Sequence, residues 1–108
     1  MTYLIVKWKH SNPDEPSLLY SEIDEQRMQH RKIDIYPDGR WGFADEHEEV
    51  GGSILGEAPT PSVDQLNSGP EYEAVEIDKD EFEKLWSVRR NAPIMTEFPL
   101  NDEGGEPS

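Results

Sequence analysis

A histidine and three carboxylates lie close together near the start of the chain and could perform acid–base chemistry. His10 begins a loop framed by prolines, and Asp14 and Glu15 lie within it. Glu22 follows in the next segment. An imidazole and a carboxylate can move protons where a pocket brings them together. These four residues are candidate catalytic groups of a small hydrolase or metal-dependent enzyme. The alternative is a surface loop whose acidic side chains accept hydrogen bonds from backbone N–H groups.

Five consecutive residues in the middle of the chain could bind a cation or a basic partner. They are Asp45, Glu46, His47, Glu48 and Glu49. Consecutive side chains rarely converge on one ion, and an EF-hand spaces its calcium ligands at alternate positions. The chain also has no cysteine and no pair of histidines spaced for zinc. We expect a solvated acidic loop that holds no metal and serves as a binding surface.

The glycine-rich run GGSILGE, residues 51–57, resembles a phosphate-binding loop only superficially. A P-loop places Lys and then Ser or Thr after its last glycine, whereas Glu57 follows Gly56 here. A carboxylate at that position would repel phosphate, so the run predicts tight turns and no nucleotide site. No motif in the chain calls for a cofactor.

A basic cluster between residues 27 and 40 could bind an anion or an acidic peptide. Its members are Arg27, His30, Arg31, Lys32 and Arg40, with Tyr36 beside them. We name Lys32, Tyr36 and Arg40 as candidate binding residues. Strand register points Arg31 to the other face, opposite Asp45, with which it could form an ion pair. The alternative is charge balance against nearby carboxylates, namely Glu22, Asp24 and Asp34.

The elements that position these groups start with a hairpin in the segment RKIDIYPDGRWGFA, residues 31–44. Pro-Asp-Gly is a turn signal, but two registers are possible. A three-residue loop with Gly39 in a bulge pairs Ile35 with Trp41 and Ile33 with Phe43. This register puts four large apolar side chains on one face, so burial favours it over a two-residue turn. The opposite face, with Lys32, Asp34, Tyr36, Arg40 and Ala44, is expected to be partly wet.

Other strands are predicted at residues 2–9, 18–23 and 72–77, where apolar and polar residues alternate or β-formers gather. Residues 45–61 lack periodicity and predict an irregular crossing loop, followed by one or two helical turns behind Ser62. A helix is predicted from Lys79 to about Val88, with Asp78 as N-cap. Its apolar stripe, which consists of Phe82, Leu85 and Trp86, should cover the hairpin's apolar face.

The expected fold is therefore α+β, with a mainly antiparallel sheet of four to five strands covered by a C-terminal helix. Residues 1–90 should form a single domain, and residues 91–108 an acidic, largely disordered tail. The chain has 108 residues and only 33% hydrophobic residues, so the core is modest. It contains no cysteine, no long apolar run and no signal peptide, which favours a cytoplasmic protein.

The net charge of −14 is unevenly distributed. Residues 1–40 carry six basic and seven acidic side chains, residues 41–90 four and thirteen, and residues 91–108 none and four. Phosphate contacts need clustered Lys and Arg, so binding to nucleic acid is not expected, and neither is binding to a membrane. A basic protein is the partner that this charge favours, although acidic charge also simply maintains solubility.

Four segments together resemble a family of small, uncharacterised, mainly bacterial proteins that is catalogued as a domain of unknown function. They are WKHSNPDEPSLLYSEID, RKIDIYPDGRWGFA, GGSILGEAPTPS and EIDKDEFEKLW, in this order over roughly residues 3–88. The resemblance implies a single compact domain, and it implies no catalytic residue, cofactor or substrate.

Three functions are consistent with these observations. The leading hypothesis is a non-enzymatic protein-binding module, for example an immunity-type inhibitor whose acidic residues 45–49 and 71–80 neutralise a basic toxin. The second is the small hydrolase or metal-dependent enzyme with His10, Asp14, Glu15 and Glu22. The third is a structural domain that oligomerises through an exposed sheet face. The sequence leaves the oligomeric state open.

Overall fold

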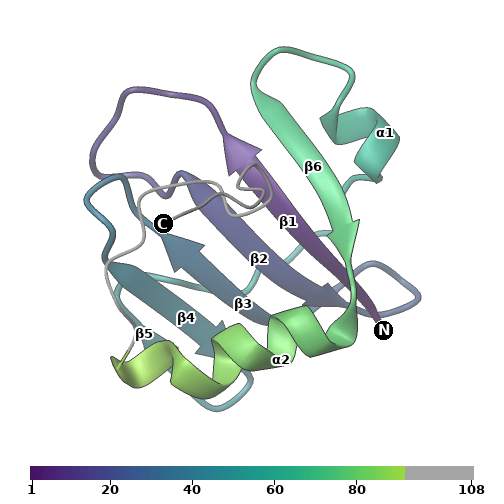
Figure 1. The fold of residues 1–108 in the computed structure, drawn as a ribbon. Coiled ribbons are helices and arrows are strands. Elements are labelled where there is room, and N and C mark those ends of the chain that lie inside the picture. Colours follow the sequence, from purple (N-terminus) through teal and green to yellow (C-terminus); the bar gives the residue numbers. More distant parts are fainter. Residues whose placement is uncertain (92–108) are drawn as a thin grey trace, which may run out of the picture.

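The computed structural model describes residues 1–91, and the predicted tail, residues 91–108, lies outside this part except for its first residue. Six antiparallel strands form one open sheet in the order β5-β4-β3-β2-β1-β6, with helix α2 across one face (Figure 1). The elements are β1 (Thr2–Trp8), β2 (Leu18–Ile23), β3 (Gln29–Ile35), β4 (Trp41–Asp45), β5 (Glu49–Val50), α1 (Val63–Leu66), β6 (Tyr72–Ile77), α2 (Lys79–Val88) and the 3₁₀ turn η1 (Arg89–Asn91).

The hairpin of β3 and β4 has the register that burial favoured. Ile35 pairs with Trp41, and Ile33 pairs with Phe43. The loop closes with hydrogen bonds from the Tyr36 N–H to the Arg40 carbonyl at 2.9 Å and from the Gly39 N–H to the Tyr36 carbonyl at 2.8 Å. Gly39 has φ 90°, a left-handed conformation that residues with a side chain rarely adopt. The three-residue loop with a bulge is confirmed.

Helix α2 covers the apolar face of this hairpin, as predicted. The Asp78 side chain accepts a hydrogen bond from the Glu81 N–H at 2.9 Å and caps the helix. Phe82 is completely buried, while Leu85 and Trp86 pack against the same core at partial exposure. The buried members of this core are Tyr3, Ile5, Leu18, Tyr20, Ile33, Ile35, Phe43, Ile77 and Phe82.

The sheet has one strand more than predicted, because β5 forms within the segment expected to be irregular. It has two residues, Glu49 and Val50, which pair with Ala44 and Phe43 of β4. A strand of two residues is too short to show an alternating pattern, which explains why sequence periodicity missed it.

A second layer covers the other face of the sheet. Residues 51–61, here called the strap, run behind the sheet from β5 towards α1 (Figure 1). The prediction of a partly wet face was wrong for Asp34, Tyr36 and Ala44, whose exposed fractions are 3%, 8% and 0%. Both faces of the sheet are therefore buried, which leaves the edges and ends as the accessible surface.

The strap lies close to the sheet at a contact between two glycines. A Cβ added to Gly42 would lie 2.8 Å from the carbonyl oxygen of Gly51, and Gly51 itself has φ 68°. Both positions thus exclude a side chain. Among residues 1–91, no helix is long and apolar enough to cross a membrane.

Candidate functional site

His10 has a structural role at the end of β1. Its Nε2 lies 2.8 Å from the carbonyl oxygen of Pro16, and its Nδ1 accepts the Asn12 N–H at 3.0 Å. These two contacts assign the proton to Nε2 and use both ring nitrogens. The ring also packs edge-on against Trp8, with centroids 4.5 Å apart. In this arrangement neither nitrogen is available to a substrate.

The other predicted catalytic residues do not join His10. Asp14 and Glu15 are exposed in the same loop. Glu22 lies near the opposite end of the sheet, where it pairs with Tyr3 on β1. Tyr3 and His10 are seven positions apart, which corresponds to about 23 Å along an extended strand. The structure therefore does not bring these four candidates together.

Glu22 belongs instead to a partly buried charge cluster beneath α2. The Arg31 guanidinium donates two hydrogen bonds to Glu22 at 2.8 and 2.7 Å and two to Glu83 at 3.1 and 2.6 Å. The Tyr3 hydroxyl donates to Glu22 at 2.9 Å. Arg31 holds the pKa of Glu22 below its usual range, against the opposing effect of burial.

This cluster corrects one prediction. Arg31 does lie opposite Asp45 in the β3–β4 register, but its ion pairs go to Glu22 and Glu83. The guanidinium also lies over the rings of Phe82 and Trp86, at 5.0 and 5.1 Å from their centroids. Contacts with α2 therefore determine the position of the Arg31 side chain, and cross-strand register alone does not reveal these contacts.

The basic cluster between residues 27 and 40 mainly holds the strap. Lys32 donates to the carbonyl of Ile54 at 3.1 Å, and the Tyr36 hydroxyl donates to that of Gly51 at 3.1 Å. Arg27 donates to the carbonyls of Thr60 and Pro61 at 2.7 and 2.8 Å. Two members lie elsewhere: His30 contacts Asp24 at 2.8 Å, and the exposed Arg40 contacts Asp38 at 2.6 Å.

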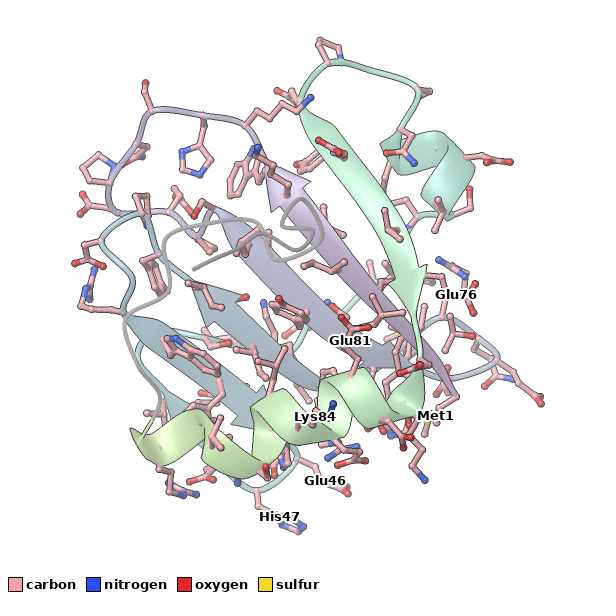
Figure 2. All side chains as sticks on the ribbon, viewed as in Figure 1. Met1, Glu46, His47, Glu76, Glu81 and Lys84 are labelled. Atoms are coloured by element: carbon pink, nitrogen blue, oxygen red, sulfur yellow. The ribbon has the colours of Figure 1, made fainter. Side chains whose placement is uncertain are left out.

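In the acidic loop, residues 45–49, two of the five side chains already make contacts within the domain. Asp45 accepts the N–H groups of His47 and Glu48 at 2.8 and 3.0 Å, which lowers its pKa. Glu48 forms ion pairs with Arg89 at 3.7 Å and with Arg90. Glu46, His47 and Glu49 remain exposed around a shallow hollow of about 330 Å³. Figure 2 shows Glu46 and His47 pointing away from the domain beyond α2.

A second acidic surface lies at the opposite edge of the sheet, along β6 and the first turn of α2. We call it the β6 surface. Its acidic members are Glu71, Glu73, Glu76, Asp78 and Asp80. All are exposed except Glu73, which is half-buried and lies 4.0 Å from Lys9. Two apolar side chains are exposed beside them, Val75 at 39% and Met1 at 65%.

The β6 surface includes an open hollow of about 360 Å³ at the junction of β6 and α2. Met1, Tyr3, Glu76, Ile77, Asp78 and Lys79 line it. Figure 2 shows Met1 and Glu76 on the β6 side of the molecule, and Glu46 and His47 below α2. Five strand spacings separate β5 from β6, about 24 Å. The two acidic segments that were predicted to form one face are therefore two separate surfaces.

Metal binding has no support in the described part of the chain. Within residues 1–91, no three His, Cys, Asp or Glu side chains are grouped so that they could hold a metal ion. These residues include the acidic loop, 45–49.

Sequence reasoning missed one polar residue with a specific role, Asn67. Its side-chain amide donates to the carbonyl of Ala74 at 2.9 Å and accepts the N–H of Ala74 at 2.7 Å. Asn67 is the C-cap of α1, behind a capping box formed by Ser62 and Gln65. A lone asparagine after a short helix gives no signal in the sequence that it contacts a strand seven residues later.

These features define a small α+β domain with an open antiparallel sheet, covered on both faces and acidic along one edge. The chain belongs to the family described as Domain of unknown function (DUF6881), whose model matches residues 2–91. No curated protein and no solved structure matches the chain. The resemblance to an uncharacterised family is thus confirmed at the level of the family.

Proposed function

We propose that this domain is a non-enzymatic protein-binding module whose β6 surface binds a basic protein, in the manner of an immunity-type inhibitor. One observation carries the proposal: five acidic side chains lie along β6 and the start of α2, four of them exposed, with exposed Val75 and Met1 among them. Charge attracts and orients a basic partner, and apolar groups desolvated in the complex supply affinity.

The β6 surface supports this function better than the acidic loop does. In the loop, Glu48 is paired with Arg89 and Arg90, and Asp45 accepts two backbone N–H groups. On the β6 surface, Glu76 and Asp80 make no ion pair among the described residues, while Asp78 caps α2. Unpaired charge is the part of the surface that a partner can neutralise without first breaking a contact.

The enzyme hypothesis has no comparable support. Its histidine uses both ring nitrogens for backbone groups, and Glu22 pairs with Tyr3, near the other end of β1 from His10. The proposal further places the protein in the bacterial cytoplasm, because a chain without cysteine suits a reducing compartment.

The test is affinity capture from a lysate of the encoding organism, with two matched variants. One variant neutralises the β6 surface by Glu71→Gln, Glu73→Gln and Glu76→Gln. The control neutralises the acidic loop by Glu46→Gln and Glu49→Gln. We expect a basic protein to be captured by the wild type and the control and lost by the β6 variant.

Salt provides a second criterion for the same experiment. Between about 0.1 M and about 1 M NaCl the Debye length falls from about 10 Å to about 3 Å, which should release the captured protein. Capture that both variants retain, or that survives the higher salt unchanged, contradicts the proposal.

A further inference from the structure

Strand β6 is an edge strand, and its outer edge carries peptide groups that face away from the sheet. The Lys9 N–H donates to the Glu71 carbonyl at 2.8 Å, and the same register pairs Lys7 with Glu73 and Ile5 with Val75. In an antiparallel ladder the pairs that exchange hydrogen bonds recur at every second residue. The peptide groups of Tyr72, Ala74 and Glu76 therefore point outward.

Helix α1 lies beside this edge (Figure 1), and the side chain of its C-cap residue occupies the middle of the edge. The Asn67 amide makes both hydrogen bonds with Ala74 that a residue of a neighbouring strand would make, one as donor and one as acceptor. The outward peptide groups of Tyr72 and Glu76, on either side, have no hydrogen-bond partner in the part of the chain that the structure describes. Unpaired strand edges readily accept a further strand, and proteins commonly protect them.

The side chains around the edge define the chemistry of a strand that would pair there. Glu73 and Val75 project on the α2 side of the sheet, and Tyr72 and Glu76 on the other side, because side chains alternate along a strand. Glu71 and Asp78 follow at the two ends. A strand beside β6 thus meets carboxylates on both faces, together with one exposed valine.

We propose that β6 binds an extended, lysine- or arginine-rich segment of the partner by strand addition, and that the Asn67 amide is a placeholder which that segment displaces together with the four-residue helix α1, none of whose residues is buried. The inference rests on the proposed function and specifies its binding mode. Strand addition draws affinity from main-chain hydrogen bonds, and side chains on alternate positions give specificity. Displacement replaces the two hydrogen bonds of Asn67 with two from the bound strand. It also adds hydrogen bonds to the outward peptide groups of Tyr72 and Glu76.

The experiment uses the full chain and a capped synthetic peptide of alternating lysine and valine, KVKVKVK, with EVEVEVE as the charge control. Asn67→Ala removes the placeholder, and Asn12→Ala, in an exposed loop far along the chain from β6, is the matched control. We expect Asn67→Ala to bind KVKVKVK about tenfold more tightly than the wild type, which corresponds to about 1.4 kcal/mol. Asn12→Ala should bind like the wild type, and EVEVEVE should bind to none of them.

Amide hydrogen exchange distinguishes strand addition from other binding. Upon addition of KVKVKVK, exchange should slow at the outward N–H groups of Tyr72, Ala74 and Glu76. The inward N–H groups of Glu73 and Val75 already bond to β1 and should not change. Asn67→Asp is a conservative variant, because its carboxylate can still accept the Ala74 N–H but cannot donate to the Ala74 carbonyl. It should bind the peptide more tightly than the wild type does.

Three results would overturn the inference. Salt-sensitive binding of KVKVKVK without alternating protection would leave the proposed function standing and refute strand addition. Absence of binding to wild type and Asn67→Ala at low salt would refute both. Concentration-dependent self-association of Asn67→Ala in sedimentation, without peptide binding, would show that the edge accepts a second copy of this chain, which contradicts a basic occupant.

Discussion

Replacing Arg31 by Met should destabilise the domain by about 3 kcal/mol at neutral pH. Arg31 is the only cation within hydrogen-bond distance of Glu22 in the described chain, and the Glu22 side chain is 9% exposed. Removing one partner of a buried ion pair typically costs about 3–5 kcal/mol, because the other charge remains buried without compensation. The Arg31 side chain is 20% exposed and so partly hydrated, which favours the lower end of that range.

The remaining contacts of Arg31 change this figure little. The Glu83 side chain is 40% exposed, so its pair with Arg31 should contribute no more than about 1 kcal/mol. Methionine keeps an unbranched apolar side chain over Phe82 and Trp86, so packing is largely preserved while the charge is lost. A domain of this size is stable by about 5–15 kcal/mol, so the variant should still fold.

The pH dependence identifies the mechanism. In the wild type, the pKa of Glu22 is lowered by Arg31 from its ordinary value of 4.5, so the pair's contribution is present above that value and is lost as pH falls through the lowered pKa. In Arg31→Met, burial raises the pKa of Glu22 against the smaller effect of the Tyr3 hydrogen bond, and protonation relieves the uncompensated charge. The difference in unfolding free energy between wild type and variant should therefore shrink from pH 7 to pH 4.

Urea denaturation followed by tryptophan fluorescence measures this difference. With a slope of about 1.5 kcal/mol per molar, a loss of about 3 kcal/mol lowers the midpoint by about 2 M. Glu83→Gln is the matched control and should lose about 1 kcal/mol or less. Adding Glu22→Gln to Arg31→Met should recover part of the stability. A loss below about 1 kcal/mol at pH 7, or one that grows towards pH 4, would refute this reasoning.

Three further predictions concern the core, the strap and a buried carboxylate. Phe82→Ala should cost about 3–5 kcal/mol in urea denaturation, because Phe82 is completely buried; a loss under about 1 kcal/mol would contradict its central position. Gly42→Ala should cost about 1–3 kcal/mol, since its Cβ would meet the Gly51 carbonyl at 2.8 Å, and an unchanged melting temperature would be inconsistent with that contact. Burial raises the pKa of Asp34, so its stabilising contribution is largest at low pH and declines as pH rises through that pKa. The unfolding free energy of Asp34→Asn relative to wild type should therefore increase from pH 4 to pH 7, and a decrease would refute the assignment.

Local sequence patterns predicted those parts of the fold whose structure depends on residues close together in the chain. The hairpin register followed from Gly39 and from the need to bury Ile33, Ile35, Trp41 and Phe43 together. The capped helix and its apolar stripe followed from spacing at i, i+3 and i+4. In each case a one-residue error would expose several large side chains, so the sequence restricts the answer strongly.

The strap and the charge cluster were not predictable in this way. The strap has no periodicity, and its contacts join Lys32 to Ile54 and Arg27 to Thr60, pairs that are 22 and 33 residues apart. Arg31 meets Glu83 across 52 residues. Such pairs form only when the sheet has already brought distant segments together, so residue types along one strand do not reveal them. For this reason Asp34 and Ala44 were assigned to a wet face and are in fact buried.

The same contacts explain why residues suited to chemistry were poor guides to the functional site. Only 33% of the residues are hydrophobic, so polar side chains must hold several layers of this domain together. His10 closes a loop, Lys32 and Tyr36 fasten the strap, and Arg31 joins the sheet to α2. A buried polar group without its partner is costly, so each of these residues is constrained by stability before any activity is considered. The informative residues are therefore exposed carboxylates without an ion pair among residues 1–91, and Glu76 and Asp80 of the β6 surface are two of them.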